Sequence, residues 1–170
     1  VKYMDILGIV SSSPSNIIVA LFKLRYSDFS SFSLCFNSTI LSPVIFDLDS
    51  TLLDSLDDLT DSVNYTLNKL NYPLRTKEEI RSFAGNGIEK LLELSVPEKT
   101  SYDKFAKCLF IFKEYYSKNL MNKTKPYDGI MELLRYLSEN KYKIAVVSNK
   151  FQEGVTNLNN HYFSEYIQVA

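Results

Sequence analysis

Two aspartates separated by one residue, Asp47 and Asp49, are the side chains of this chain best suited to chemistry. They follow the apolar run Val44–Phe46, which is typical of a buried strand. Alternate side chains of a strand point the same way, so both carboxylates should lie together where the strand ends. Paired carboxylates favour a divalent cation such as Mg²⁺, because their repulsion needs a counter-charge. An aspartate so placed can also be a nucleophile that forms an aspartyl-phosphate.

The residues after the pair make it more specific than a chance D-x-D. The whole block, Val44 to Ser55, reads as an apolar strand followed by D-L-D-S-T-L-L-D-S. It resembles the first motif of the haloacid dehalogenase (HAD) superfamily of phosphatases, which is written D-x-D-G-T-L-x-D-S. Ser50 stands where the family usually has glycine, and we expect this small residue to be tolerated.

Further segments, in the right order and spacing, are similar to the phosphoglycolate-phosphatase-like branch of that superfamily. The resemblance covers about residues 44 to 168. Besides the first motif, it rests on Asp54 to Tyr72, Phe83 to Ile88, Tyr127 to Gly129 and Ile144 to Lys150.

The resemblance implies roles for the residues of the first motif. Asp47 would attack the phosphorus, and Asp49 would protonate the leaving oxygen and then deprotonate water. Mg²⁺ would be held by the Asp47 carboxylate and by Asp49 through its main-chain carbonyl. Thr51 is expected to help bind the phosphate.

Two other segments receive roles in the same way. Ser148 looks like the second motif, with its hydroxyl and Asn149 cradling phosphate near a helix start. The triplet Gly85, Asn86 and Gly87 falls at the substrate loop of this branch, although a plain helix-breaking turn explains it equally well. Lys150 is expected to be a solvated residue at a helix start, because the family's catalytic lysine comes later in the chain.

The pattern between Asp49 and Lys143 predicts helices. Apolar residues at helical spacing predict five of them, near Leu56 to Leu70, from Thr76, near Ile88 to Leu92, near Phe105 to Leu120, and near Ile130 to Leu137. A crossover between parallel strands needs only one helix, so residues 56–123 are expected to form an inserted helical cap.

The strands around that insertion define the fold class. The runs Val44–Asp49 and Ile144–Ser148 should be adjacent parallel strands, and one more short strand is expected near Tyr166–Val169. We therefore predict an α/β fold: an incomplete, HAD-type, Rossmann-like sheet formed by residues 44–55 and 124–170. The resemblance implies a C1-type cap facing the carboxyl ends of the strands, where ligands bind in open parallel sheets.

Residues 1–43 do not match the rest. They are crowded with serine and lack a sustained period outside Ile17–Leu24. We expect a loosely held extension, a targeting segment, or sequence upstream of a truncated gene. We expect this segment to contribute little to the fold, so a run Ile17–Leu24 that fills a vacant sheet edge would contradict the expectation.

The net charge and the few cysteines and histidines limit the classes of partner and metal site that the chain could have. Nineteen basic and twenty acidic residues leave a formal charge of −1, which favours neither nucleic acid nor an anionic membrane. Cys35 and Cys108 look like reduced thiols of a cytoplasmic protein, and the single His161 excludes a histidine-rich metal site. The partner implied by the resemblance is a small phosphorylated metabolite, and the oligomeric state stays open.

The motifs expected after Lys150 lead to three alternatives. Neither Lys-Pro-x-Pro nor Gly-Asp-x-x-x-Asp occurs there, so the resemblance indicates the N-terminal portion of a magnesium-dependent phosphatase, weakly active or inactive by itself. A non-catalytic phosphate-binding module of the same fold is the second possibility. A phosphosugar mutase relative is the third.

Overall fold

Two buried apolar strands form the centre of the fold. The computed structural model describes residues 18–19 and 44–170. Strands β2 (Val44–Phe46) and β5 (Ile144–Val146) are buried along their whole length and pair in parallel, with Val44 opposite Ile144 and Phe46 opposite Val146. The predicted adjacency of the two strands is confirmed, although both end earlier than the sequence suggested.

The outer edge of β2 carries strand β1 (Ile18–Val19), so the strand order is β1-β2-β5. Ile18 pairs with Val44 and Val19 with Ile45, again in parallel. These two residues lie in the segment that was expected to contribute little to the fold, and their pairing with β2 departs from that expectation. The other residues of the 1–43 segment lie outside the described part of the chain, and what was expected of them stays a prediction.

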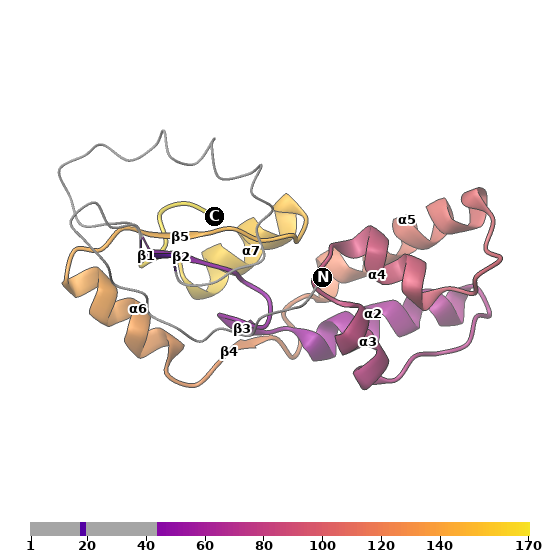
Figure 1. Cartoon of the computed structure of the whole chain (residues 1–170), viewed down its shortest axis with the longest axis horizontal. Coiled ribbons are helices and arrows are strands. Elements are labelled where there is room, and N and C mark those ends of the chain that lie inside the picture. The colour runs from indigo at the N-terminus through magenta and orange to yellow at the C-terminus, as the bar shows by residue number, and fades with distance from the viewer. Residues whose placement is uncertain (1–17, 20–43) are drawn as a thin grey trace.

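Two helices flank the strands. Helix α6 (Ile130–Glu139) begins after Gly129, whose φ of 84° places it in the left-handed region that favours glycine. Helix α7 (Gln152–Tyr162) follows β5 (Figure 1). Leu134 of α6 and Leu158 of α7 belong to the same buried cluster as the strand residues. This shared core confirms the predicted α/β class.

The strand predicted near the C-terminus is reduced to one isolated parallel bridge between Ala145 and Val169. Tyr166 and Ile167 both donate their backbone N–H to the carbonyl of Phe163. The chain is therefore still turning after α7 at these positions, and residues 168–169 are all that reaches β5.

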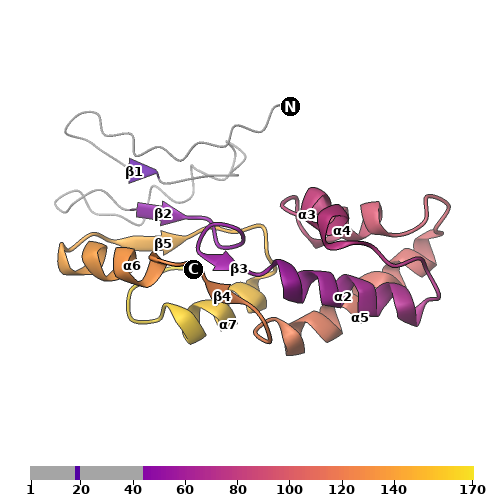
Figure 2. The same ribbon diagram turned by 90° about the horizontal axis from the view of Figure 1, so that it is seen from below.

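Four helices lie beyond the sheet, in the segment predicted to be a cap (Figures 1 and 2). They are α2 (Leu56–Lys69), α3 (Lys77–Phe83), α4 (Ile88–Ser95) and α5 (Tyr102–Asn119). The predicted capping box is present, since the Glu79 N–H donates to the Thr76 hydroxyl and the Thr76 N–H to the Glu79 carboxylate.

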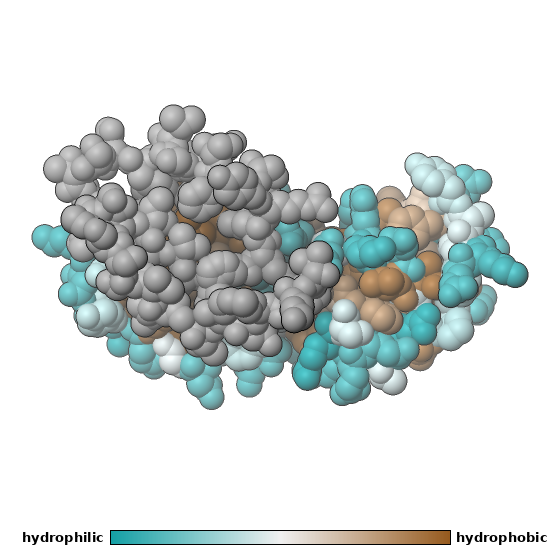
Figure 3. Space-filling model, viewed as in Figure 1, coloured by the Kyte–Doolittle hydropathy of each residue, from teal (hydrophilic) through white to brown (hydrophobic). Residues whose placement is uncertain are grey.

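The helices of this predicted cap, called the cap below, contribute buried residues to the same apolar cluster as the strands. Val63 and Leu67 of α2, with Phe112 of α5, are fully buried. Cys108 is also buried, on the apolar side of α5 as predicted. Figure 3 shows apolar residues between polar ones on the visible face of these helices. Within the described residues, no helix is long and apolar enough to span a membrane.

The chain enters and leaves the cap through two paired segments. β3 (Leu53–Asp54) and β4 (Lys125–Pro126) are antiparallel, with Leu53 opposite Pro126. Beside them, the buried Asp58 carboxylate at the start of α2 accepts hydrogen bonds from the backbone N–H groups of Lys123 and Thr124 and from the Thr124 hydroxyl. Asp58 therefore links the segment that enters the cap to the segment that leaves it.

Candidate active site

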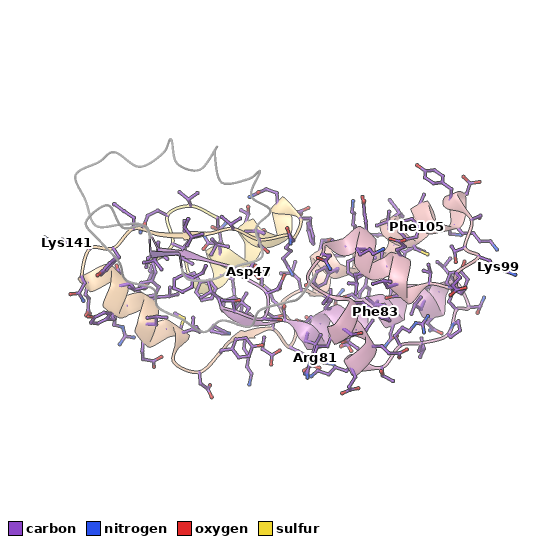
Figure 4. All side chains as sticks on the ribbon, in the orientation of Figure 1. Asp47, Arg81, Phe83, Lys99, Phe105 and Lys141 are labelled. Atoms are coloured by element: carbon purple, nitrogen blue, oxygen red, sulfur yellow. The ribbon has the colours of Figure 1, made fainter. Side chains whose placement is uncertain are left out.

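The carboxyl ends of β2 and β5 point toward the cap helices. Lys141, which precedes β5, lies at the end of the sheet far from the cap, whereas Asp47, which follows β2, lies at the end near it (Figure 4). Because Phe46 pairs with Val146, Asp47 and Ser148 follow neighbouring strand ends at the same edge. Side chains here can meet groups from both the sheet and the cap.

A tight turn follows Asp47 and places Asp49. The backbone N–H groups of Leu52 and Leu53 both donate to the Leu48 carbonyl, and Asp49 forms a bridge to Leu53. Ser50, inside this turn, has a φ of 60°. This left-handed conformation is the physical reason why glycine suits the position.

Replacing Ser50 by glycine should therefore stabilise the protein. Glycine removes the left-handed strain, a gain of about 1–2 kcal/mol. This gain exceeds the entropic cost of ordering the more flexible glycine on folding, which is roughly 0.5–1 kcal/mol. We expect the free energy of unfolding in urea to rise by about 0.5–1 kcal/mol. The control is Ser117→Gly inside helix α5, which should lower it by about 0.5 kcal/mol. A lower free energy of unfolding in Ser50→Gly would contradict the claim that Ser50 is strained.

The Asp49 carboxylate is held by groups from three parts of the chain. The Ser55 hydroxyl donates to its Oδ1 at 2.5 Å. The Lys150 ammonium lies 3.1 Å from Oδ1 and 3.1 Å from Oδ2. The same ammonium donates to the hydroxyl of Tyr116, in cap helix α5, at 2.5 Å. The structure thus connects the second aspartate to the loop after β5 and to the cap.

The expectation that Lys150 is solvated is wrong. Its side chain is only 3% exposed, because Tyr116 covers it from the cap, with the Lys150 nitrogen 4.6 Å from the ring centroid. Helix α7 also begins later than expected, at Gln152. Lys150 therefore lies in the loop before this helix rather than on its first turn.

The charge on Lys150 is stabilised despite its burial. Burial by itself disfavours the ammonium, but the Asp49 carboxylate and the Tyr116 hydroxyl outweigh that effect and raise the pKa of Lys150 above its usual value. Burial also raises the pKa of the Tyr116 phenol, and the Lys150 charge opposes that shift. Lys150 is therefore a buried cation beside the side chain of Asp49.

The other predicted site residues are distributed between the sheet and the cap. The Ser148 hydroxyl accepts from the Lys150 backbone N–H at 3.2 Å, and the Asn149 side-chain amide donates to the Gly85 carbonyl at 3.1 Å. Gly87 also lies near the Asn149 carbonyl. Asn149 thus contacts the predicted substrate loop, and phosphate binding by Ser148 and Asn149 stays a prediction.

The remaining predicted site residues are Thr51 and the loop formed by Gly85, Asn86 and Gly87. The loop joins α3 to α4, and its two glycines have φ values of 104° and 85°, so a helix-breaking turn is present whatever else the loop does. Thr51 lies in the turn after Asp49. Their contacts with substrate stay predictions.

The oxygen donors at the strand ends fit Mg²⁺ chemically. Mg²⁺ in phosphate enzymes is held through one or two carboxylates together with substrate oxygens and water, and Asp47 supplies such a carboxylate. Because the Asp49 carboxylate is engaged by Lys150 and Ser55, its main-chain carbonyl is the expected ligand. Within the described residues, no group of three His, Cys, Asp or Glu side chains could hold a metal by itself.

Sequence reasoning missed Tyr116 and Ser55 as neighbours of Asp49. Tyr116 lies in the helix predicted near Phe105 to Leu120, at apolar spacing with Phe112 and Leu120, and a tyrosine on such a stripe needs a hydrogen-bond partner for its hydroxyl, which is the signal that could have indicated it. Ser55 precedes α2 but makes no side-chain cap for that helix. Its hydroxyl goes to Asp49 instead.

Comparison with known proteins gives a family match over the described core and cap. Residues 44–170 match the family model "Haloacid dehalogenase-like hydrolase". A phosphoglycolate phosphatase of Nitrosococcus oceani is 31% identical over 111 residues, which are 63% of this chain and 49% of that protein. Another from Aquifex aeolicus is 35% identical over 111 residues, with 65% and 50% covered.

Solved structures agree with this match. A predicted phosphoglycolate phosphatase from Haemophilus somnus superposes with a TM-score of 0.72 at 28% identity, covering 78% of this chain and 63% of that one. A second such structure, from Lactobacillus delbrueckii, has a TM-score of 0.68 at 30% identity, with 75% and 63% covered. The chain spans about half the length of the named relatives it matches.

Proposed function

Because the chain belongs to the haloacid dehalogenase-like hydrolase family, we propose that it carries the reactive aspartates of a magnesium-dependent phosphate-monoester hydrolase. The observation that carries this proposal is that Asp47 and Asp49 follow the carboxyl end of β2, with Asp47 at the end of the sheet near the cap (Figure 4). The relatives named phosphoglycolate phosphatase support a small phosphorylated metabolite as the substrate class.

The chemistry begins at Asp47. Its carboxylate oxygen attacks the phosphorus, the bond from phosphorus to the ester oxygen breaks, and an aspartyl-phosphate forms. Asp49 gives a proton to the departing alcohol oxygen and later removes one from the water that releases phosphate. Bound Mg²⁺ would neutralise charge on the transferring phosphoryl group.

The groups around Asp49 support its role in proton transfer. Ser55 and Lys150 fix the carboxylate from two sides, and a carboxylate held in place can remove the proton from water with a smaller loss of orientation entropy. The Ser148 hydroxyl and the backbone N–H groups after it are the proposed phosphate contacts.

The test is phosphate release from phosphoglycolate and from p-nitrophenyl phosphate, with Mg²⁺ and after its removal by EDTA. We expect any release above background to require Mg²⁺ and to be absent from Asp47→Asn, because the nucleophile is gone. The matched control is Asp61→Asn, which changes an exposed aspartate on α2 and should keep the wild-type rate. Metal-independent release, or an unaffected Asp47→Asn variant, would contradict the proposal.

A further inference from the structure

One loop after β5, residues 149–151, contacts the cap. Asn149 donates to the carbonyl of Gly85 in the loop between α3 and α4. Lys150 donates to the Tyr116 hydroxyl, and the Phe151 ring meets the Tyr116 ring edge-on, with centroids 6.0 Å apart. Three consecutive residues after β5 therefore touch the cap.

The Lys150 ammonium already has three acceptor oxygens around it in this arrangement. An ammonium has three N–H groups, and its three hydrogen-bond acceptors are Asp49 Oδ1, Asp49 Oδ2 and the Tyr116 hydroxyl. A phosphate ligand would need at least one of these bonds to break. The geometry therefore favours an action of Lys150 on Asp49 over direct phosphate binding.

The strength of the pair between Lys150 and Asp49 depends on the cap. Tyr116 keeps the Lys150 side chain out of water, and an ion pair is much stronger when water is excluded. An exposed pair of the same kind contributes little and does not hold a carboxylate in one orientation. Separation of cap and sheet would thus weaken the pair and leave the Ser55 hydroxyl as the main group that holds the Asp49 carboxylate.

We propose that Lys150 is a positioning residue that fixes the Asp49 carboxylate only while Tyr116 of the cap is docked over it. The inference rests on the proposed function, in which Asp49 transfers the proton. In that reaction the carboxylate that removes the proton from water is ordered while Tyr116 is docked over Lys150, so proton transfer and cap docking are coupled through a single ammonium.

The first experiment needs no activity. Acetylation of lysines by acetic anhydride, followed by peptide mass spectrometry, compares Lys150 with the exposed Lys99. We expect Lys150 to react at least about tenfold more slowly in the wild type, because acetylation requires access. Tyr116→Phe keeps the ring but removes the hydroxyl, and should speed the labelling of Lys150 severalfold without changing Lys99. Equal labelling of both lysines in the wild type, or no effect of Tyr116→Phe, would overturn the inference.

The second experiment measures kcat and KM for p-nitrophenyl phosphate. Lys150→Met should lower kcat by about 10–100-fold while KM changes less than about twofold, because a misplaced catalytic group affects the chemical step. Lys150→Arg, which keeps the charge and can still pair with Asp49, should recover part of kcat. A rise in KM at unchanged kcat would overturn the inference in favour of substrate binding. Failure of Asp47→Asn to affect turnover would instead count against the proposed function, and the labelling would still test Lys150.

Discussion

Replacing Asp49 by asparagine should lower the free energy of unfolding by about 2–3 kcal/mol, because it leaves a buried ammonium without its counter-charge. The Lys150 side chain is 3% exposed, whereas that of Asp49 is 35% exposed, so the effect should lie at or below the lower end of the range for buried pairs. For a chain of this size the melting temperature should fall by roughly 4–10 °C. Urea unfolding measures the change in free energy, and thermal unfolding measures the change in melting temperature.

The reason for the loss can be isolated with a second variant. In Asp49→Asn combined with Lys150→Met, both charges are gone, and stability should return at least halfway toward the wild type. Asp61→Asn breaks an exposed pair with Lys123 and should leave the unfolding midpoint near its wild-type value. A double variant as unstable as Asp49→Asn alone would show that the unpaired ammonium is not the cause.

Replacing Asp58 by alanine should have an effect of similar size, for a different reason. Its carboxylate is 2% exposed and accepts the backbone N–H groups of Lys123 and Thr124. Each buried N–H left without an acceptor costs about 1–3 kcal/mol. We expect a loss of about 3 kcal/mol in the free energy of unfolding, together with faster amide hydrogen exchange at Lys123 and Thr124.

Asp58→Asn provides the graded control. It keeps one carbonyl oxygen as an acceptor, so the loss should be about half of that in the alanine variant. Thr124→Val removes only the hydroxyl contact and should cost about 1 kcal/mol. Unchanged amide exchange at Thr124 in Asp58→Ala would show that Asp58 does not hold the segment in which the chain leaves the cap.

Local patterns were sufficient to predict most of the elements. The apolar runs at 44–46 and 144–146 are short and unbroken, as strands covered on both faces should be, and they pair as predicted. The capping box at Thr76 fixed the start of α3 because both of its hydrogen bonds are local. Near the C-terminus the same reasoning failed, since Tyr166 bonds back to Phe163 instead of extending.

The surroundings of Asp49 could not be predicted in the same way. Lys150 is 101 residues from Asp49 and 34 from Tyr116 in the sequence, and no local pattern indicates that a cap helix will cover it. A lysine beside two polar residues looks solvated until the fold brings a tyrosine over it. Long-range contacts of this kind decide which charges become buried, and they follow from packing rather than from periodicity.

The most direct test of a reactive Asp47 is to trap its phosphoryl adduct. The full chain is mixed with Mg²⁺ and phosphoglycolate, and borohydride then reduces any aspartyl-phosphate to homoserine, which mass spectrometry locates in the peptide around residues 44–55. Trapping detects a single transfer, so it does not depend on the turnover rate. We expect homoserine at position 47, only with Mg²⁺ and not in Asp47→Asn. No homoserine under these conditions, or homoserine at another aspartate, would contradict the assignment of Asp47 as the nucleophile.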